Sequence, residues 1–235
     1  MKLQLGSWIS TGSSIITELA GLCGLDWILL DLEHGCTTAT NVLPQLQSLA
    51  GTHTQAIVRV NSLAPEQIAL VLDWNAHGIM VPHVSTAEKA RAFVQAAYHP
   101  PRGSRGVAKT VRATGYGLRS HAENPPPLLI AQIESGQAVE NAPSIAAVEG
   151  IDVLFVGPAD LQQDLAHHGA AYGRSYEQSL QHVCQAAASH NKSAGILLRN
   201  ADDIELHTNL GFSFIAVESD IGILRSAYKQ LMAHR

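Results

Sequence analysis

The stretch IDVLFVGPADL, residues Ile151–Leu161, carries the pattern that decides the fold. Its core, Val153–Val156, is a continuous run of apolar residues. Such a run, rich in β-branched and aromatic side chains, is typical of a strand buried on both faces in a parallel sheet. Pro158 lacks an amide hydrogen and therefore ends the strand. Asp160 is thus expected just past the carboxyl end of a buried strand.

The preceding unit of the chain repeats this pattern. Leu128–Ile133 is another apolar run, and it ends on the carboxylate of Glu134. In an α/β barrel the carboxyl ends of all strands meet at one rim, where the chemistry takes place. If the two strands are neighbours, Glu134 and Asp160 converge there. Two carboxylates without a nearby lysine favour a bound cation.

Strand-like runs and helical patterns alternate along the whole chain, which predicts a single (β/α)8 TIM-barrel domain over residues 1–235. The other strand-like runs are Leu5–Ile9, Trp27–Leu30, Ala56–Val60, Gly78–Val81, Ala194–Leu198 and Phe214–Val217. The helical patterns are Ser14–Ala20, Pro65–Leu72, Thr86–Tyr98, Gln137–Val148, Tyr176–His190, Asp202–Thr208 and Ile221–Met232. The segment His99–Pro127, rich in Pro, Gly and Arg, is expected on the catalytic side, where long loops are often functional.

Composition narrows the class of protein further. Hydrophobic residues make up 46% of the 235 residues and charged residues 15%, which permits a large core. A net charge of −5 without a basic run argues against a nucleic-acid surface. No apolar run is long enough to span a membrane, and no signal peptide is recognised. Three widely spaced cysteines predict reduced thiols and a cytoplasmic location.

The rim also carries groups suited to proton transfer and to binding an oxyanion. His34 follows the second strand-like run, and Arg59 lies in the third. Histidine suits acid–base work near neutral pH, and arginine offers a fixed fork of donors to an enolate or carboxylate. The carboxylates suit Mg²⁺ or Mn²⁺ rather than zinc. A chelating 2-oxo acid would complete the coordination, with the metal as Lewis acid.

The lysines separate two kinds of aldolase chemistry. A Schiff-base enzyme needs a lysine that faces the barrel interior. No lysine lies in a strand-like run; the five are Lys2, Lys89, Lys109, Lys192 and Lys229. Metal-enolate chemistry is therefore favoured over imine chemistry.

Each rim residue taken alone also has a purely structural interpretation. Asp160 and Glu134 could cap the helices that follow them. His34 could be a hydrogen-bonded packing residue, and Arg59 could pair with Asp31 across adjacent strands. The functional interpretation is favoured because all four residues fall at the same end of different strands.

At this point the chain resembles the HpcH/HpaI aldolases, metal-dependent class II enzymes that cleave 4-hydroxy-2-oxo acids to pyruvate and an aldehyde. The resemblance extends from Trp8 to about Ser219. It rests on six motifs: DLEHG (31–35), VRV (58–60), VPHV (81–84), HPPRGSRG (99–106), QIE (132–134) and GPADL (157–161).

The resemblance implies a role in the reaction for each residue that matches a functional position of the family. Glu134 and Asp160 would be the ligands of a divalent metal, Mg²⁺, Mn²⁺ or Co²⁺. Arg59 would hold the keto or enolate oxygen, and His34 would be the acid–base residue. Asp73 matches the residue that partners this histidine in the family.

The resemblance also implies the substrate pocket and the assembly. Trp8 would lie on the pocket wall and Gln132 would line the pocket. The backbone amides of Ala159 and Asp160 would bind the pyruvate carboxylate. Family members are hexamers built from dimers that exchange their last helix, here about 221–232, so we expect a homo-oligomer, either a hexamer or a dimer of this kind.

Three positions depart from the family pattern. Asn75-Ala76 replaces the usual Gly-Ala, with little expected effect because Asn tolerates the left-handed conformation. His83 stands where the family usually has an apolar residue, which is expected to alter the pocket. The segment Thr114–Pro127 looks shorter than in relatives and is expected to border the aldehyde site.

Two other functions remain open from the sequence. Related barrels act on citryl- or malyl-type CoA thioesters, and one branch makes citrate from oxaloacetate without a metal; arginines near the mouth would suit CoA, namely Arg102, Arg105, Arg112 and Arg119. A non-catalytic barrel protein is the other alternative, since fold alone does not prove activity. Rim carboxylates paired with arginines would favour it.

Overall fold

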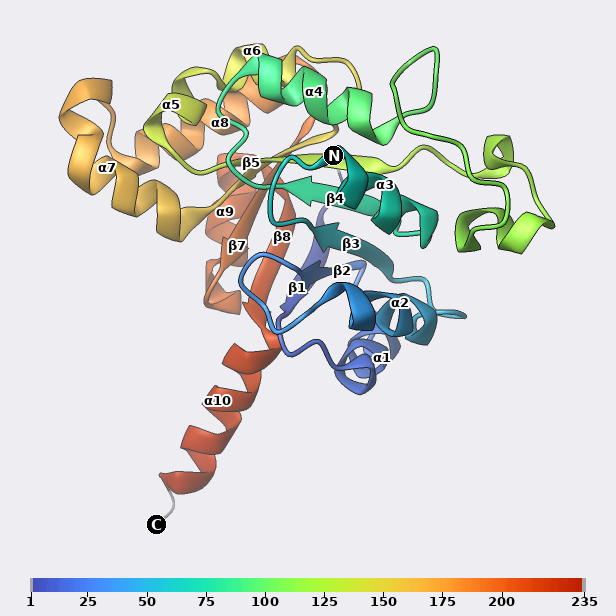
Figure 1. The fold of residues 1–235 in the computed structure, drawn as a ribbon. Coiled ribbons are helices and arrows are strands. Elements are labelled where there is room, and N and C mark those ends of the chain that lie inside the picture. Colours follow the sequence, from blue (N-terminus) through green and yellow to red (C-terminus); the bar gives the residue numbers. More distant parts are fainter. Residues whose placement is uncertain (1, 234–235) are drawn as a thin grey trace.

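A computed structural model describes residues 2–233 of the chain. The strands form a closed barrel in the order β1-β2-β3-β4-β5-β6-β7-β8, and every neighbouring pair is parallel (Figure 1). Their bounds are Gln4–Ile9, Trp27–Asp31, Gln55–Arg59, Gly78–Val81, Leu128–Ile133, Val153–Val156, Ser193–Leu198 and Phe212–Ser219. The predicted (β/α)8 barrel is confirmed, and each strand coincides with a predicted run to within two residues at either end.

Helices surround the barrel (Figure 1). Those from α1 to α6 are Ser14–Leu22, Ala39–Ser48, Pro65–Asp73, Ala87–Ala97, Gly136–Glu140 and Ala142–Ala146. Those from α7 to α10 are Pro158–Tyr172, Tyr176–Ser189, Ile204–Leu210 and Asp220–Met232. Within the described residues, no helix is long and apolar enough to cross a bilayer.

The sequence prediction of helices fails at three places. The helices α2 and α7 were not anticipated: α2 carries Pro44 in its interior, and α7 has only a weak apolar stripe behind Gly157 and Pro158. The single helix predicted over 137–148 is two helices, α5 and α6, which meet at Asn141. Pro143 explains the break, because a proline cannot donate to a continuous helix ladder.

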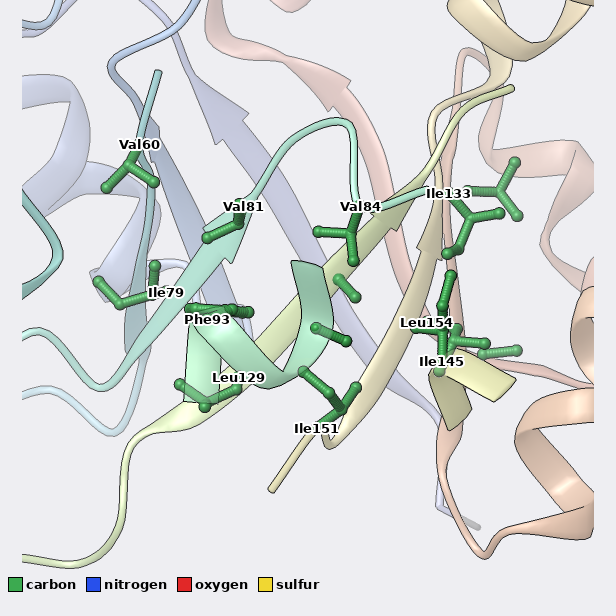
Figure 2. Close-up of a cluster of buried hydrophobic side chains, with 14 of the residues drawn as sticks. Val60, Ile79, Val81, Val84, Phe93, Leu129, Ile133, Ile145, Ile151 and Leu154 are labelled. Carbon is green, nitrogen blue, oxygen red and sulfur yellow. The ribbon is translucent and has the colours of Figure 1, made fainter. Parts of the chain in front are cut away.

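The core has two layers. Between the barrel and its helices lies a large aliphatic layer, part of which Figure 2 shows around Phe93, Ile79 and Leu154. Inside the barrel lies an aromatic cluster in which Trp27 stacks on Phe214 with ring centroids 4.1 Å apart. Gly6 makes room for this cluster, because a Cβ there would lie 2.3 Å from the Trp27 ring.

The long segment between α4 and β5 does not lie on the catalytic side, so that expectation is wrong. It follows the end of an outer helix and precedes the start of a strand, which puts it at the amino-end face of the barrel (Figure 1). Arg112 anchors it there by donating to the carbonyl of Trp74 at the end of α3, at 2.7 Å, and to that of Leu46 in α2, at 3.2 Å.

Helix α10 leaves the barrel and extends away from it (Figure 1). Its first residue, Asp220, is buried and ties it to the loop after β1 by accepting from the backbone amides of Ser10 and Thr11, at 2.8 and 3.0 Å. Beyond this anchor the apolar side chains of α10 are exposed: Ile221, Ile223, Leu224, Tyr228, Leu231 and Met232.

The inner aromatic cluster gives a first prediction. Phe214→Ala leaves a cavity beside Trp27, so we expect the free energy of unfolding to fall by about 3–5 kcal/mol in a urea titration. Leu118→Ala is the control, since Leu118 is 90% exposed and its truncation is expected to cost less than about 0.5 kcal/mol. Equal stability of the two variants would contradict this account of the core.

Candidate active site

One side of the carboxyl-end rim is built on a buried ion pair. Asp31 and Arg59 are paired in register at the ends of β2 and β3. Arg59 donates from Nε to Asp31 Oδ1 at 2.9 Å and from Nη2 to Oδ2 at 2.7 Å, and its Nη1 lies 2.7 Å from Glu33 Oε2. The interpretation of Arg59 as a partner of Asp31 is therefore confirmed. A guanidinium has five N–H groups, and the two hydrogen bonds to Asp31 leave others for a ligand oxygen.

Trp8 lies beneath this arginine. It is 5% exposed and belongs to the aromatic cluster inside the barrel. The guanidinium carbon of Arg59 stands 5.6 Å from the centre of its ring, a cation–π contact. Trp8 thus forms the floor under the rim rather than a side wall.

Glu134 stands at the end of β5 and is 4% exposed. Its Oε1 accepts from the backbone amide of His83 at 2.7 Å and lies 2.8 Å from His83 Nδ1. Burial raises the pKa of Glu134; the contacts with His83 lower it, and the negative charges of Glu33 and Asp160 raise it. The helix after β5 is capped by Ser135, so the alternative that Glu134 is a helix cap is wrong.

Asp160 lies in the first turn of α7, directly after β6. The N-cap of that helix is Gly157, so Asp160 is not the cap residue. Gly157 is also needed for space, because a Cβ there would lie 2.6 Å from Glu134 Oε2. The amides of Ala159 and Asp160 belong to the first turn, where N–H groups have no intrahelical acceptor and favour anions.

The donor set at Glu134 and Asp160 fits a divalent cation. Both are hard oxygen donors, and the negative charge of Asp160 acts on Glu134, which is already desolvated. Beside them Gln132 Oε1 is buried without a hydrogen-bond partner, which suits contact with a further ligand. Within residues 2–233 no group of three or more His, Cys, Asp or Glu side chains forms a metal cage. The remaining positions of a cation would therefore go to water or substrate.

His34 follows β2 in a turn made by Asp31. Asp31 Oδ1 accepts from the backbone amides of Glu33 and His34, at 3.0 and 3.3 Å. The imidazole of His34 is 68% exposed, with Nε2 3.9 Å from Glu33 Oε2. On the other side of Glu33, Oε1 lies 3.6 Å from His83 Nε2. The side chain of Glu33 therefore lies between two histidines.

Asp73 does not join this group within one chain. It is the last residue of α3, at the amino-end face of the barrel, and it pairs with Arg105 at 2.5 Å. The partnership with His34 that the resemblance implies is therefore not made inside the described chain, because the two residues lie at opposite ends of the barrel.

The arginines of the long segment are likewise remote from the rim. The expectation that Arg102, Arg105, Arg112 and Arg119 surround the mouth is wrong, because their segment lies at the amino-end face. For the same reason Thr114–Pro127 does not border the site of its own chain. Within one chain, the arginines that motivated a CoA-handling enzyme are therefore not at the mouth of the barrel.

Three residues at the rim have no predicted role in the chemistry of the site: Asp31, Glu33 and His83. Asp31 and Glu33 can be found from the sequence, because they are polar residues at the end of a strand-like run, and the sequence indicates the pairing of Asp31 with Arg59. His83 contacts Glu134 only because its backbone takes a positive φ of 54°, a conformation that the sequence does not announce for histidine.

A parallel eight-stranded barrel that carries acids, an arginine and a histidine at its carboxyl end has the architecture of a barrel enzyme. The family model described as HpcH/HpaI aldolase/citrate lyase matches residues 4–227. The chain belongs to this family and is an enzyme of the aldolase class. Among curated relatives, the 5-keto-4-deoxy-D-glucarate aldolase of Escherichia coli (strain ATCC 8739) is 37% identical over 98% of this chain and 91% of its own.

Solved structures agree with this assignment. An HpcH/HpaI aldolase/citrate lyase family protein from Burkholderia cenocepacia J2315 matches with a TM-score of 0.92 and 31% identity, covering 99% of this chain and 94% of its own. The citrate synthase SbnG matches with a TM-score of 0.86 and 26% identity, covering 99% and 93%. The barrel thus resembles both aldolase-family and citrate synthase structures.

The raised pKa of Glu134 gives a prediction for the metal-free protein. The native state keeps a proton that the unfolded chain releases, so the free energy of unfolding falls as pH rises from the ordinary value of 4.5 through the raised pKa. The Gln side chain of Glu134→Gln cannot ionise, so the variant lacks this loss of stability at high pH. In excess chelator we therefore expect Glu134→Gln to melt at a higher temperature than the wild type at about pH 8 and at the same temperature near pH 4.

Glu149→Gln is the control for this experiment, because the Glu149 side chain is 95% exposed. We expect its melting temperature to follow the wild type at both pH values. A Glu134→Gln variant that melts below the wild type at about pH 8 would show that the carboxylate of Glu134 is not destabilised by burial.

Proposed function

We propose that this protein is a divalent-metal-dependent aldolase. It cleaves 4-hydroxy-2-oxo acids to pyruvate and an aldehyde, and it forms them from the same two compounds. The observation that carries the proposal is that Glu134 and Asp160 follow the neighbouring parallel strands β5 and β6 at the carboxyl-end rim, where Asp160 lies in the first turn of α7. A carboxylate of the substrate and a cation both find suitable groups there. The name of the E. coli relative makes 5-keto-4-deoxy-D-glucarate the first substrate to test.

The substrate carboxylate is the first group that we assign. In our proposal it accepts from the amides of Ala159 and Asp160, because the N-terminus of a long helix favours an anion. Gln132, whose Oε1 has no partner, lines the same pocket and takes a hydroxyl of the substrate or a water.

Arg59 is proposed to bind the keto oxygen as negative charge builds up on it. Two hydrogen bonds to Asp31 and the ion pair with Glu33 fix the plane of the guanidinium. The N–H groups that do not bond to Asp31 are then oriented before the substrate arrives, and donors oriented in advance stabilise developing charge most effectively.

The cofactor is proposed to be Mg²⁺, Mn²⁺ or Co²⁺ held by Glu134 and Asp160. Bound there, the metal would supply Lewis acidity that draws charge onto the keto oxygen. In the cleavage direction, His34 is proposed to accept the proton of the 4-hydroxyl group, directly or through water, as the bond between C3 and C4 breaks. Glu33 Oε2 lies 3.9 Å from His34 Nε2, on the same turn after β2.

A second copy of the chain is proposed to complete this machinery. Since Asp73 lies at the amino-end face, it reaches a His34 only if a neighbouring copy brings that face to the rim. The exposed apolar side of α10 supports such an assembly, because a helix anchored at one end buries that side only against another molecule. We propose a homo-oligomer, a hexamer or a dimer, in which the α10 helices are exchanged between copies of one barrel domain.

The cytoplasm is proposed as the location. The three cysteines, Cys23, Cys36 and Cys184, are free thiols, which a reducing compartment maintains.

The proposed chemistry predicts the following. Purified protein should release pyruvate from 5-keto-4-deoxy-D-glucarate, excess chelator should abolish the reaction, and Mn²⁺ or Mg²⁺ should restore it. Glu134→Ala should lower kcat/KM by at least about 10³-fold, because it removes a metal ligand. The measurement is pyruvate release coupled to lactate dehydrogenase.

Glu149→Ala is the control and should keep the activity, because that side chain lies in solvent at the amino-end face. Full activity of Glu134→Ala in the presence of chelator would contradict a metal-dependent mechanism. Formation of citrate from oxaloacetate and an acetyl thioester, in the presence of chelator, would favour citrate synthase chemistry instead.

The proposed assembly predicts that a charge on α10 breaks it. Tyr228→Glu puts a carboxylate on the exposed apolar side, 63% exposed in the single chain. We expect this variant to elute at a smaller mass in size-exclusion chromatography with light scattering, while Glu88→Lys on α4 leaves the mass unchanged. A wild-type protein that is monomeric at micromolar concentration would contradict the assembly.

A further inference from the structure

His83 takes a strained backbone conformation at the rim. It follows Pro82 at the end of β4, with a φ of 54°, and its side chain is 65% exposed. Histidine rarely adopts the left-handed region, and such residues persist where surrounding contacts require them. Two contacts hold this one: Lys89 Nζ donates to the carbonyl of His83 at 3.0 Å, and the next residue, Val84, is buried and donates to the carbonyl of Gln132 at 3.2 Å.

The strained turn brings two nitrogens of one residue to a single oxygen. The amide of His83 donates to Glu134 Oε1 at 2.7 Å, and Nδ1 of the imidazole lies 2.8 Å from the same oxygen. Nε2 of the imidazole lies 3.6 Å from Glu33 Oε1. The ring is thereby held between the carboxylates of β2 and β5.

The other oxygen of Glu134 faces a different neighbour. A Cβ on Gly157 would lie 2.6 Å from Oε2, so this oxygen points at the junction of β6 and α7. Asp160 lies in the first turn after that junction. One carboxylate therefore has its Oε1 occupied by His83 and its Oε2 presented toward the second acid.

We propose that His83 is a positioning residue for the cation site: its amide and imidazole bind Oε1 of Glu134 and so hold Oε2 toward a divalent metal shared with Asp160. This inference rests on the metal site proposed above. Outer residues that orient a metal ligand in this way affect metal affinity by about 10–100-fold. An apolar residue at position 83, as in the resembling family, would keep the amide contact and lose the imidazole contact.

The test is the affinity for Mn²⁺ and for Mg²⁺, measured by isothermal titration calorimetry on the full chain without substrate. We expect His83→Phe to raise both Kd values by about 10–100-fold. His83→Asn, whose amide can still donate to Glu134, should stay within about 5-fold of the wild type. His53→Phe, an exposed histidine at the amino-end face, is the matched control and should bind as the wild type does.

The outcomes separate the inference from the proposed function. If the wild type binds a cation and His83→Phe binds it equally well, the positioning role is wrong and the metal site stands. If Mn²⁺ affinity falls while Mg²⁺ affinity does not, the imidazole is a direct ligand and the positioning role is also wrong. If the wild type binds no divalent cation, the metal-dependent function itself fails. A circular-dichroism melt of each metal-free variant shows whether it is folded.

Discussion

The rim depends on the buried pair of Asp31 and Arg59. The two residues are direct neighbours in the ladder between β2 and β3, so their side chains emerge on the same side at the same height. Two hydrogen bonds join them, and both residues are less than 10% exposed. Removing either partner would leave an unpaired buried charge, which costs several kcal/mol. The same Asp31 shapes the turn that carries Glu33 and His34.

The pair of Asp31 and Arg59 also determines which acids of the rim lack a positively charged arginine partner. Asp31 and Glu33 both contact Arg59, so two carboxylates face a single guanidinium on this side of the rim. Glu134 and Asp160 have no arginine partner among the described residues, and Glu134 is buried. A non-catalytic barrel would be favoured if every rim acid were paired with an arginine. Asp31 and Glu33 are paired in this way, whereas, within residues 2–233, Glu134 and Asp160 on the other side of the rim are not. A cation is the simplest complement to that side.

Sequence reasoning predicted the strands well because buried parallel strands are continuous apolar runs, and it predicted that the rim acids converge because all parallel strands end on one face. It failed where the signal is weak or non-local. The helix α7 begins at Pro158, only two residues after the end of β6, and has a weak apolar stripe. The long segment at 99–127 was put on the wrong face, although its place after a helix and before a strand already fixes the amino-end face. The contact of His83 depends on one backbone angle, which depends in turn on tertiary contacts.

Asp73 shows how the two faces of the barrel are linked through assembly. A helix that follows a strand runs back along the barrel, so its last residue lies at the face opposite the rim. Asp73 ends α3 and is held by Arg105 from the long segment. A role for it at His34 therefore requires a neighbouring chain. In that arrangement the amino-end face would serve the chemistry of a second copy, and the long segment would border a neighbour's site rather than its own. The exposed side of α10 offers the surface on which such a pair of chains can form.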